Sequence, residues 1–126
     1  MACGLDSTRS GGTVDDRVQR TIATMHEQLH RRLTVVELAT RAGLSVAHLT
    51  RLFRDATGAT PAAFLHRLRM ERARILLERT SLTVHEVMTQ VGIADRSHFA
   101  RDFMRTYGSS PRQFRVDILS DRAADV

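Results

Sequence analysis

Two kinds of side chain in this sequence have types and spacings that suit chemistry: histidines around a glutamate, and arginines among short polar residues. His26, Glu27 and His30 form the pattern His-Glu-x-x-His. On a helix, histidines four residues apart share one face and bind zinc, while the glutamate activates a water molecule. The pattern is therefore a candidate zinc-peptidase site. A catalytic zinc site needs a third protein ligand. The segments that would have to supply this ligand belong to an internal repeat. We therefore interpret the pattern as a coincidence on a helix surface.

Arginine supplies the second kind of chemistry, because its planar guanidinium grips phosphate oxygens and the edge of guanine. The chain has 19 basic side chains, all of them arginine, and 14 acidic ones, which gives a net charge of +5 with neutral histidine. The isoelectric point is about 11.1. Thirteen of the arginines and only six acidic residues fall between residues 41 and 115. This concentration of positive charge favours a surface that binds nucleic acid.

Length and composition restrict the class of protein. A chain of 126 residues, 42% hydrophobic and 26% charged, has room for one compact domain or two very small ones. No run approaches eighteen apolar residues, so we expect no membrane-spanning helix. The first residues lack a basic start followed by an apolar run, so we expect no secretory signal and a cytoplasmic protein. The single cysteine, Cys3, excludes an internal disulfide and a cysteine metal cluster.

The hydrophobic pattern predicts an all-α fold of about seven helices. Apolar residues recur with a helical period from Val14 to about Leu119, and no segment alternates convincingly as a strand. The first helix is expected to begin after Thr13 and to turn Val18, Met25 and Leu29 inward. The expected segments are a flexible leader (1–12), a domain (13–119) with a first helix-turn-helix (about 34–58), a connecting helix (about 60–78), a second helix-turn-helix (about 83–108) and a final helix (about 110–119), and a tail (120–126).

Capping residues mark where the helices begin. The pairs Thr34–Glu37 and Thr83–Glu86 each predict a capping box, in which the hydroxyl and the carboxylate bond to the free backbone amides of the first turn. Ser45 is expected to cap the helix that follows Gly43. Glycine at 43 and at Gly92 allows the left-handed backbone that redirects the chain between two helices.

The chain contains two copies of one unit. Residues 37–44 align with residues 86–93 at an offset of 49, and after one extra residue in the second copy the offset becomes 50. Each copy has a short capped helix, a glycine turn and a second helix with polar or basic outward positions, which is typical of a helix-turn-helix. The aligned pairs include Leu49 with Phe99, Arg51 with Arg101, Phe53 with Phe103, Gly58 with Gly108, and Pro61 with Pro111.

The spacing of the two copies suits one DNA duplex. The connecting helix from Pro61 to Glu78 has about 18 residues and would be about 27 Å long. Successive major grooves on one side of a duplex lie about 34 Å apart. A rod of this length with a packed unit at each end would place two recognition helices in adjacent grooves, so one chain would do what usually needs a dimer.

These segments resemble the DNA-binding domain of the AraC/XylS transcription regulators. Residues 43–54 with Gly58 carry the first half of the resemblance, and residues 91–103 with residues 107–115 carry the second. The resemblance covers roughly residues 14–116. It implies two homeodomain-like helix-turn-helix subdomains joined by a long helix. It also implies promoter binding in a bacterium, more often to activate transcription than to repress it, with RNA polymerase as a partner.

The resemblance also implies which residues contact DNA. Ala47 offers only a methyl group, which suits thymine, while Arg51 and Arg101 are the leading base readers. The expected base contacts are Ala47, Thr50, Arg51, Arg96, Ser97, His98 and Arg101, and the expected phosphate contacts are Ser45, Arg54, Arg105 and Arg112.

Enzyme chemistry has little support elsewhere in the sequence. No glycine-rich phosphate loop or serine nucleophile motif is present, so we expect no catalytic residue, cofactor or metal. The main alternative to a DNA-binding protein is a helical protein-interaction module whose outward face docks an acidic partner, and competition by unrelated DNA fragments would distinguish the two. We expect a monomer or weak dimer near the nucleoid, without membrane association.

Overall fold

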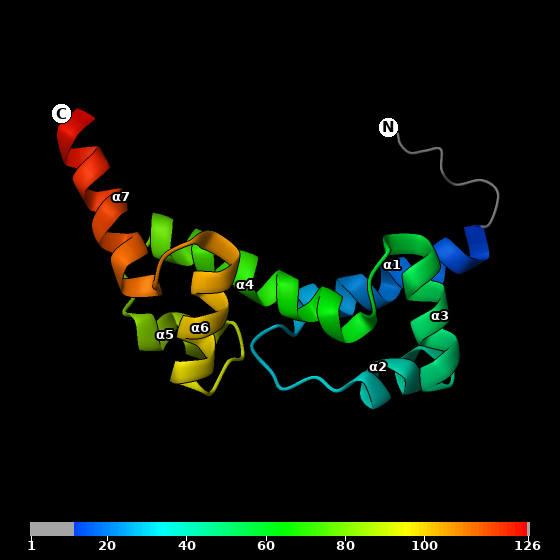
Figure 1. Ribbon diagram of the computed structural model, residues 1–126. Helices are drawn as coiled ribbons and strands as arrows, with labels where there is room; N and C mark the ends of the chain where they lie inside the picture. Colours follow the sequence, from blue (N-terminus) through cyan, green and yellow to red (C-terminus); the bar gives the residue numbers. More distant parts are fainter. Residues whose placement is uncertain (1–11, 126) are drawn as a thin grey trace. The chain divides into compact units, whose positions relative to one another are not determined.

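The computed structural model describes the backbone of residues 12–125 and the side chains of residues 16–122. This part of the chain is all-helical, without strands (Figure 1). The all-α prediction is therefore confirmed, while most of the predicted leader and Cys3 lie outside the described residues. The helices are α1 (Gly12–Glu27), α2 (Val35–Ala42), α3 (Val46–Thr57), α4 (Pro61–Arg79), α5 (Val84–Gln90), α6 (Arg96–Tyr107) and α7 (Pro111–Asp125).

Two compact units make up the fold. Unit 1 contains α1, α2, α3 and the first residues of α4, up to His66. Unit 2 contains the rest of α4 from Arg67, followed by α5, α6 and α7. It also includes the short segment Leu29–Arg32, which follows α1 in the chain. Each unit has its own helix-turn-helix, as the internal repeat predicts.

Apolar side chains from three helices form the core of unit 1, where α1, α2 and α3 contact one another in pairs. Met25, Leu49 and Phe53 are fully buried. The Phe53 ring meets Phe64 of α4 edge to face, with ring centroids 5.4 Å apart, an arrangement that aromatic pairs prefer. Burial of Leu49 and Phe53 determines which face of α3 turns inward and which faces solvent.

The core of unit 2 is built around Phe103 of α6. The centroid of its ring lies 5.8 Å from the ring centroid of Phe99, 4.7 Å from that of Tyr107 and 5.4 Å from that of Phe114 of α7. The other buried members of this cluster are Met70, Ala73 and Leu77 of α4, Val87 and Met88 of α5, and Val91. Helix α6 is therefore held by two aromatic anchors one turn apart, as the repeat predicts from Phe99 and Phe103.

The helix caps follow the sequence prediction closely. In α5 both halves of the capping box are present: the Thr83 amide donates to Glu86 Oε1 (2.8 Å) and the Glu86 amide donates to Thr83 Oγ1 (3.1 Å). Hydrogen bonds to the Glu86 carboxylate from the Thr83 backbone amide and then from the Thr83 hydroxyl lower the pKa of Glu86. In α2 the structure shows one half of the predicted capping box: the Glu37 amide donates to the Thr34 hydroxyl (3.0 Å), while the Glu37 carboxylate lies 3.4 Å from Arg41.

The first and last helices differ from the prediction at their ends. Helix α1 includes Gly12, so Thr13 lies inside it, and it ends at Glu27, so Leu29 is buried beyond the helix in unit 2. Helix α7 continues to Asp125, so residues 120–125, expected as part of a tail, are helical. One reason is long-range: Arg122 Nη2 donates to the main-chain oxygen of Glu78 at the end of α4 (2.6 Å).

Candidate nucleic-acid interface

Helix α3 presents the predicted residues of unit 1 on its solvent side. The hydroxyl oxygen of Ser45 accepts from the His48 amide (3.1 Å) and caps the helix, which leaves the hydroxyl hydrogen of Ser45 available as a donor. Leu49, Leu52 and Phe53 face inward. The predicted contacts lie on the remaining surface: Ala47, Arg51 and Arg54 are exposed, and Thr50 is half-buried.

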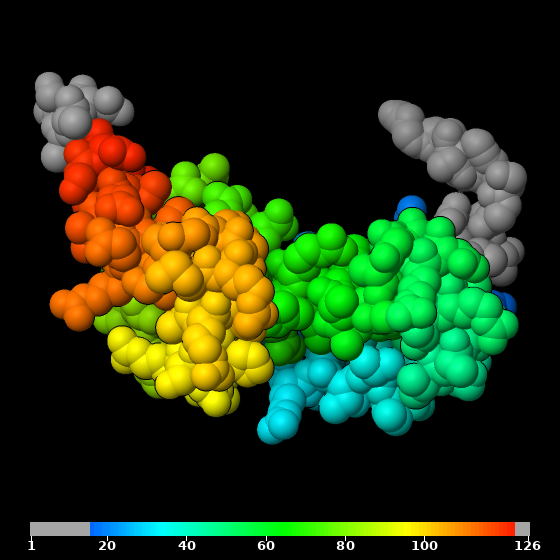
Figure 2. All heavy atoms as spheres, viewed as in Figure 1, coloured from blue at the N-terminus to red at the C-terminus, as the bar shows by residue number. Residues whose placement is uncertain are grey.

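Helix α6 has the same arrangement in unit 2. The Asp95 carboxylate caps it by accepting from the His98 amide (2.9 Å), and Phe99 and Phe103 anchor its inner face. Figure 2 shows the α6 segment, yellow to orange, at the near surface of unit 2. The predicted base contacts Arg96, Ser97, His98 and Arg101 are all exposed.

The predicted phosphate contacts come from more than one element. Arg54 and Arg105 lie in the last turns of α3 and α6, respectively. Arg112 lies in the first turn of α7 and is exposed. Arg96 and Arg112 line the same hollow between α5, α6 and α7, together with His85. Unit 2 thus brings a base-contact candidate and a phosphate-contact candidate to one surface.

Asp102 is a residue of this surface that the sequence reasoning missed. It lies on α6 among exposed basic positions, yet only 6% of it is exposed. Its Oδ2 lies 3.2 Å from His98 Nε2, and its Oδ1 lies 3.3 Å from Arg105 Nη1. The repeat contained a signal for this burial. Asp102 aligns with the apolar Leu52 of the first copy, so the alignment marks its position as an inward one.

Several arginines serve the fold instead of the outer surface. Arg69 donates from Nη1 to Gly92 O (3.1 Å) and from Nη2 to Arg31 O (2.8 Å), and burial lowers its pKa. Arg115 donates to the main-chain oxygens of Leu77, Thr80 and Leu82. The excess of arginine over acidic residues between residues 41 and 115 therefore overstates the positive charge that is available to a ligand at the outer surface.

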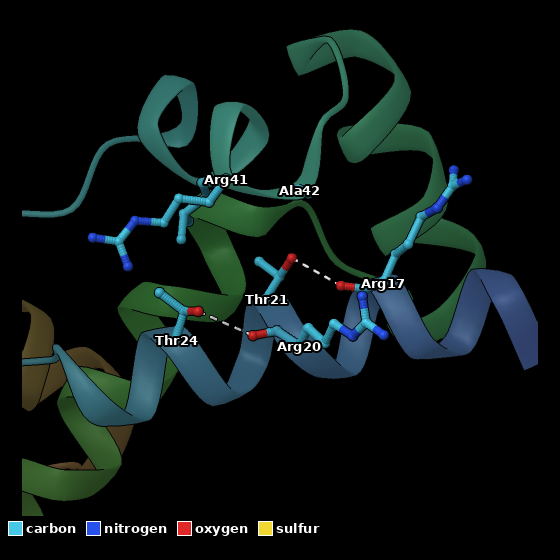
Figure 3. A pocket seen from close by; sticks show the side chains of 7 residues that line it. Arg17, Arg20, Thr21, Thr24, Arg41 and Ala42 are labelled. Carbon is cyan, nitrogen blue, oxygen red and sulfur yellow. Dashed lines mark hydrogen bonds between the residues drawn. The ribbon is translucent and has the colours of Figure 1, made fainter.

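Three further arginines border a hollow between α1 and α2 in unit 1 (Figure 3). The hydroxyls on its floor bond to backbone, since Thr21 donates to Arg17 O (2.9 Å) and Thr24 donates to Arg20 O (3.1 Å). Figure 3 shows the Arg17 and Arg41 side chains extending away from these threonines in opposite directions. The arginines do not converge, so the hollow is a poor cradle for an anion.

The histidine motif does not have the geometry of a zinc peptidase. Helix α1 ends at Glu27, so His30 lies in the turn beyond it. The expectation that His26 and His30 share one face of a helix is therefore wrong. Within the described part of the chain, no group of three histidine, cysteine, aspartate or glutamate residues is placed to hold a metal ion. None of the helices described there is both long and apolar enough to cross a bilayer.

Comparison with protein families matches residues 38–116 to a helix-turn-helix domain. The transcriptional activator NphR of Rhodococcus sp is 41% identical over 102 residues, which cover 80% of this chain and 29% of that protein. The transcriptional activator RhaS of Escherichia fergusonii is 35% identical over 101 residues, covering 80% of this chain and 36% of its own length. The chain thus spans about a third of the length of these relatives.

Solved structures resemble this chain over most of its length. The DNA-binding domain of AdpA, a global transcriptional factor solved with a target DNA, matches with a TM-score of 0.81 and 32% identity, over 85% of this chain and 96% of that one. An AraC-type regulator from Chromobacterium violaceum matches with a TM-score of 0.76 and 25% identity, over 86% and 96% of the two chains. By the family match over residues 38–116 and these likenesses, the chain belongs to the AraC/XylS family of helix-turn-helix domains.

Proposed function

We propose that this chain binds double-stranded DNA with sequence preference and regulates transcription, chiefly by activation. One observation carries the proposal. In both units a capped second helix buries its apolar side and turns an arginine outward at the matched repeat position, Arg51 on α3 and Arg101 on α6. A helix of this design enters the major groove, where arginine recognises guanine through its O6 and N7 atoms.

The proposed contacts divide into base readers and phosphate anchors. Bases are read from α3 by Ala47, Thr50 and Arg51, and from α6 by Arg96, Ser97, His98 and Arg101. Phosphates are neutralised by Arg54 and Arg105 and by Arg112 of α7, while Ser45 donates its hydroxyl. The side chains of these arginines are exposed, so they reach DNA without disturbing either core.

The two recognition helices are proposed to enter successive major grooves of one duplex. The binding site would then contain two short elements about 10 base pairs apart, because that is one turn of B-form DNA. The chain would act as a monomer or weak dimer on a promoter in the cytoplasm, near the nucleoid, with RNA polymerase as the partner that reads out binding. DNA binding of this kind requires neither a cofactor nor a catalytic residue.

Selection from a randomised duplex pool tests the proposal directly. The purified chain is expected to enrich duplexes with two conserved elements one helical turn apart, and hydroxyl-radical footprints should show two protected tracts on one face. Affinity for an enriched duplex should fall steeply with salt, since bound phosphates release counterions.

A matched control and a contrary outcome make the test decisive. Arg20→Ala removes an exposed arginine of α1 that pairs with Asp16 at 2.8 Å, and it should leave the enriched motif unchanged. Binding that is independent of salt, or that unrelated DNA fragments compete away as well as an enriched duplex does, would contradict the proposal. In that case, binding to an acidic protein partner would become the better explanation of the charged surface.

A further inference from the structure

Asp102 is a buried carboxylate on a helix whose outer face is otherwise neutral or basic. Its side chain is 8% exposed, while the side chains it holds, His98 and Arg105, are 63% and 76% exposed. His98 lies one turn before Asp102, and Arg105 lies one turn after it on the same side of α6. One shielded acid thus contacts two groups that stand at the outer surface.

The other copy of the repeat has an apolar residue at the aligned position. The aligned residue in α3 is Leu52, which is 9% exposed and belongs to the core of unit 1. A carboxylate in such a place loses hydration that its partners must offset, and replacing paired buried charges by apolar groups is often neutral or stabilising. The presence of an acid at this position of α6 therefore indicates that Asp102 has a role other than packing.

We infer that Asp102 is a positioning residue that sets the sequence preference of unit 2, an inference that rests on the DNA-binding function proposed above. Through its two oxygens it holds His98 and Arg105 in fixed orientations on α6 before DNA arrives. Its negative charge also opposes binding to phosphates of any sequence. The first effect widens the gap between preferred and non-preferred DNA, because specificity is a difference of affinities, while the second lowers affinity for all DNA alike.

The contact also determines what the held side chains offer to DNA. Nε2 of His98 lies 3.2 Å from Asp102 Oδ2, so a hydrogen on Nε2 would point to the carboxylate and would leave Nδ1 for the major groove. In the neutral ring this atom accepts from the amino group of adenine or cytosine, and in the cation it donates to an acceptor such as guanine. Arg105 uses Nη1 on Asp102 and keeps Nε and Nη2 for phosphate.

The experiment compares the affinity of the chain for a duplex enriched from the randomised pool with its affinity for a scrambled duplex of the same composition. Asp102→Asn should lower the ratio of the two affinities by about tenfold, the scale of one lost base contact. Affinity for the scrambled duplex should stay equal or rise, because a negative charge is lost.

Asp55→Asn is the matched control. Asp55 is the exposed residue of α3 that aligns with Arg105, so this change removes one negative charge from the other recognition helix. It should raise affinity for both duplexes and keep the ratio. Asp102→Leu places the side chain of the first copy at the same position, and it should lower the ratio as Asp102→Asn does while the unfolding midpoint is maintained.

A double-mutant cycle separates positioning from a general structural role. In a chain carrying His98→Ala and Arg105→Ala, Asp102→Asn should lower the ratio no further. An unchanged ratio in the single variants, an equal drop in the double-alanine background, or a parallel loss of both affinities would overturn the inference. If the unaltered chain itself binds both duplexes equally, the proposed function fails, and this inference fails with it.

Discussion

Gly92 packs directly against the main chain at Leu29: a Cβ at position 92 would lie 2.4 Å from the Leu29 carbonyl oxygen and 3.1 Å from that of Arg31. The φ angle of Gly92 is +75°, a backbone conformation that side chains with a Cβ disfavour. Arg69 fastens the same place by donating to the carbonyl oxygens of both Gly92 and Arg31. The turn of the second helix-turn-helix therefore rests on a chain segment about sixty residues before it.

Gly92→Ala is expected to destabilise unit 2 by about 2 kcal/mol or more, because backbone strain and a steric clash act together. Gly43→Ala is the matched control. Its φ angle is +71°, but no atom lies within 4 Å of an added Cβ, so only the strain of about 1–2 kcal/mol applies. Urea denaturation followed by circular dichroism compares the two, and equal losses would show that the contact with Leu29 does not matter.

Arg69→Met should cost about 2 kcal/mol of unfolding free energy. The change removes two charge-assisted hydrogen bonds and leaves the carbonyl oxygens of Gly92 and Arg31 without this donor. Arg72→Met on the exposed side of the same helix should change stability by less than about 0.5 kcal/mol. Denaturation midpoints measure both variants. A loss no larger for Arg69→Met than for Arg72→Met would contradict a bracing role for Arg69.

Arg101→Ala should weaken binding to the enriched duplex by about 1–3 kcal/mol and relax the preference at one base pair. Fluorescence anisotropy with single-base variants of the duplex identifies that position. Arg51→Ala should relax a different position, in the other half of the site, because Arg51 belongs to the other repeat copy. Loss of preference at the same base pair in both variants would refute separate reading by α3 and α6.

Arg112→Ala should weaken binding to all duplexes alike. Its proposed partner is a phosphate, which carries no base identity, so the enriched motif should stay the same. The slope of log affinity against log salt should become shallower by about one unit. Titrations at several salt concentrations provide the measurement. A changed motif with an unchanged slope would instead make Arg112 a base reader.

The cap of α5 should contribute to stability in a pH-dependent way. Bonds from Thr83 lower the folded-state pKa of Glu86 from its usual value of 4.5. The contribution of the ionised carboxylate is therefore present above about pH 4.5 and is lost as pH falls through the lower, folded-state pKa. Thr83→Ala should be less stable than the unaltered chain at pH 7, with a gap that narrows toward pH 3. Thermal unfolding of both chains across this pH range measures the gap in stability. A gap that widens as the pH falls would contradict the prediction.

The elements and the repeat could be predicted because they depend on close neighbours. Ser45 and Asp95 cap helices through amides three residues away, and Phe99 and Phe103 lie one turn apart on one face. Such contacts join residues that are close in the sequence, so a short stretch of chain is enough to predict them. The predicted contact residues on α3 and α6 were placed at the surface for the same reason, since the buried positions of each helix identify its opposite side.

Only the tertiary structure distinguished one arginine from another. The sequence determined that all 19 basic residues are arginine, but Arg115 and Arg122 bond to backbone 33 to 44 residues away while Arg101 faces solvent. Burial of Asp102 and the support of Gly92 by Leu29 arise in the same way. Local periodicity carries no information about which distant carbonyl oxygen or core will meet a side chain, because that depends on how whole helices pack.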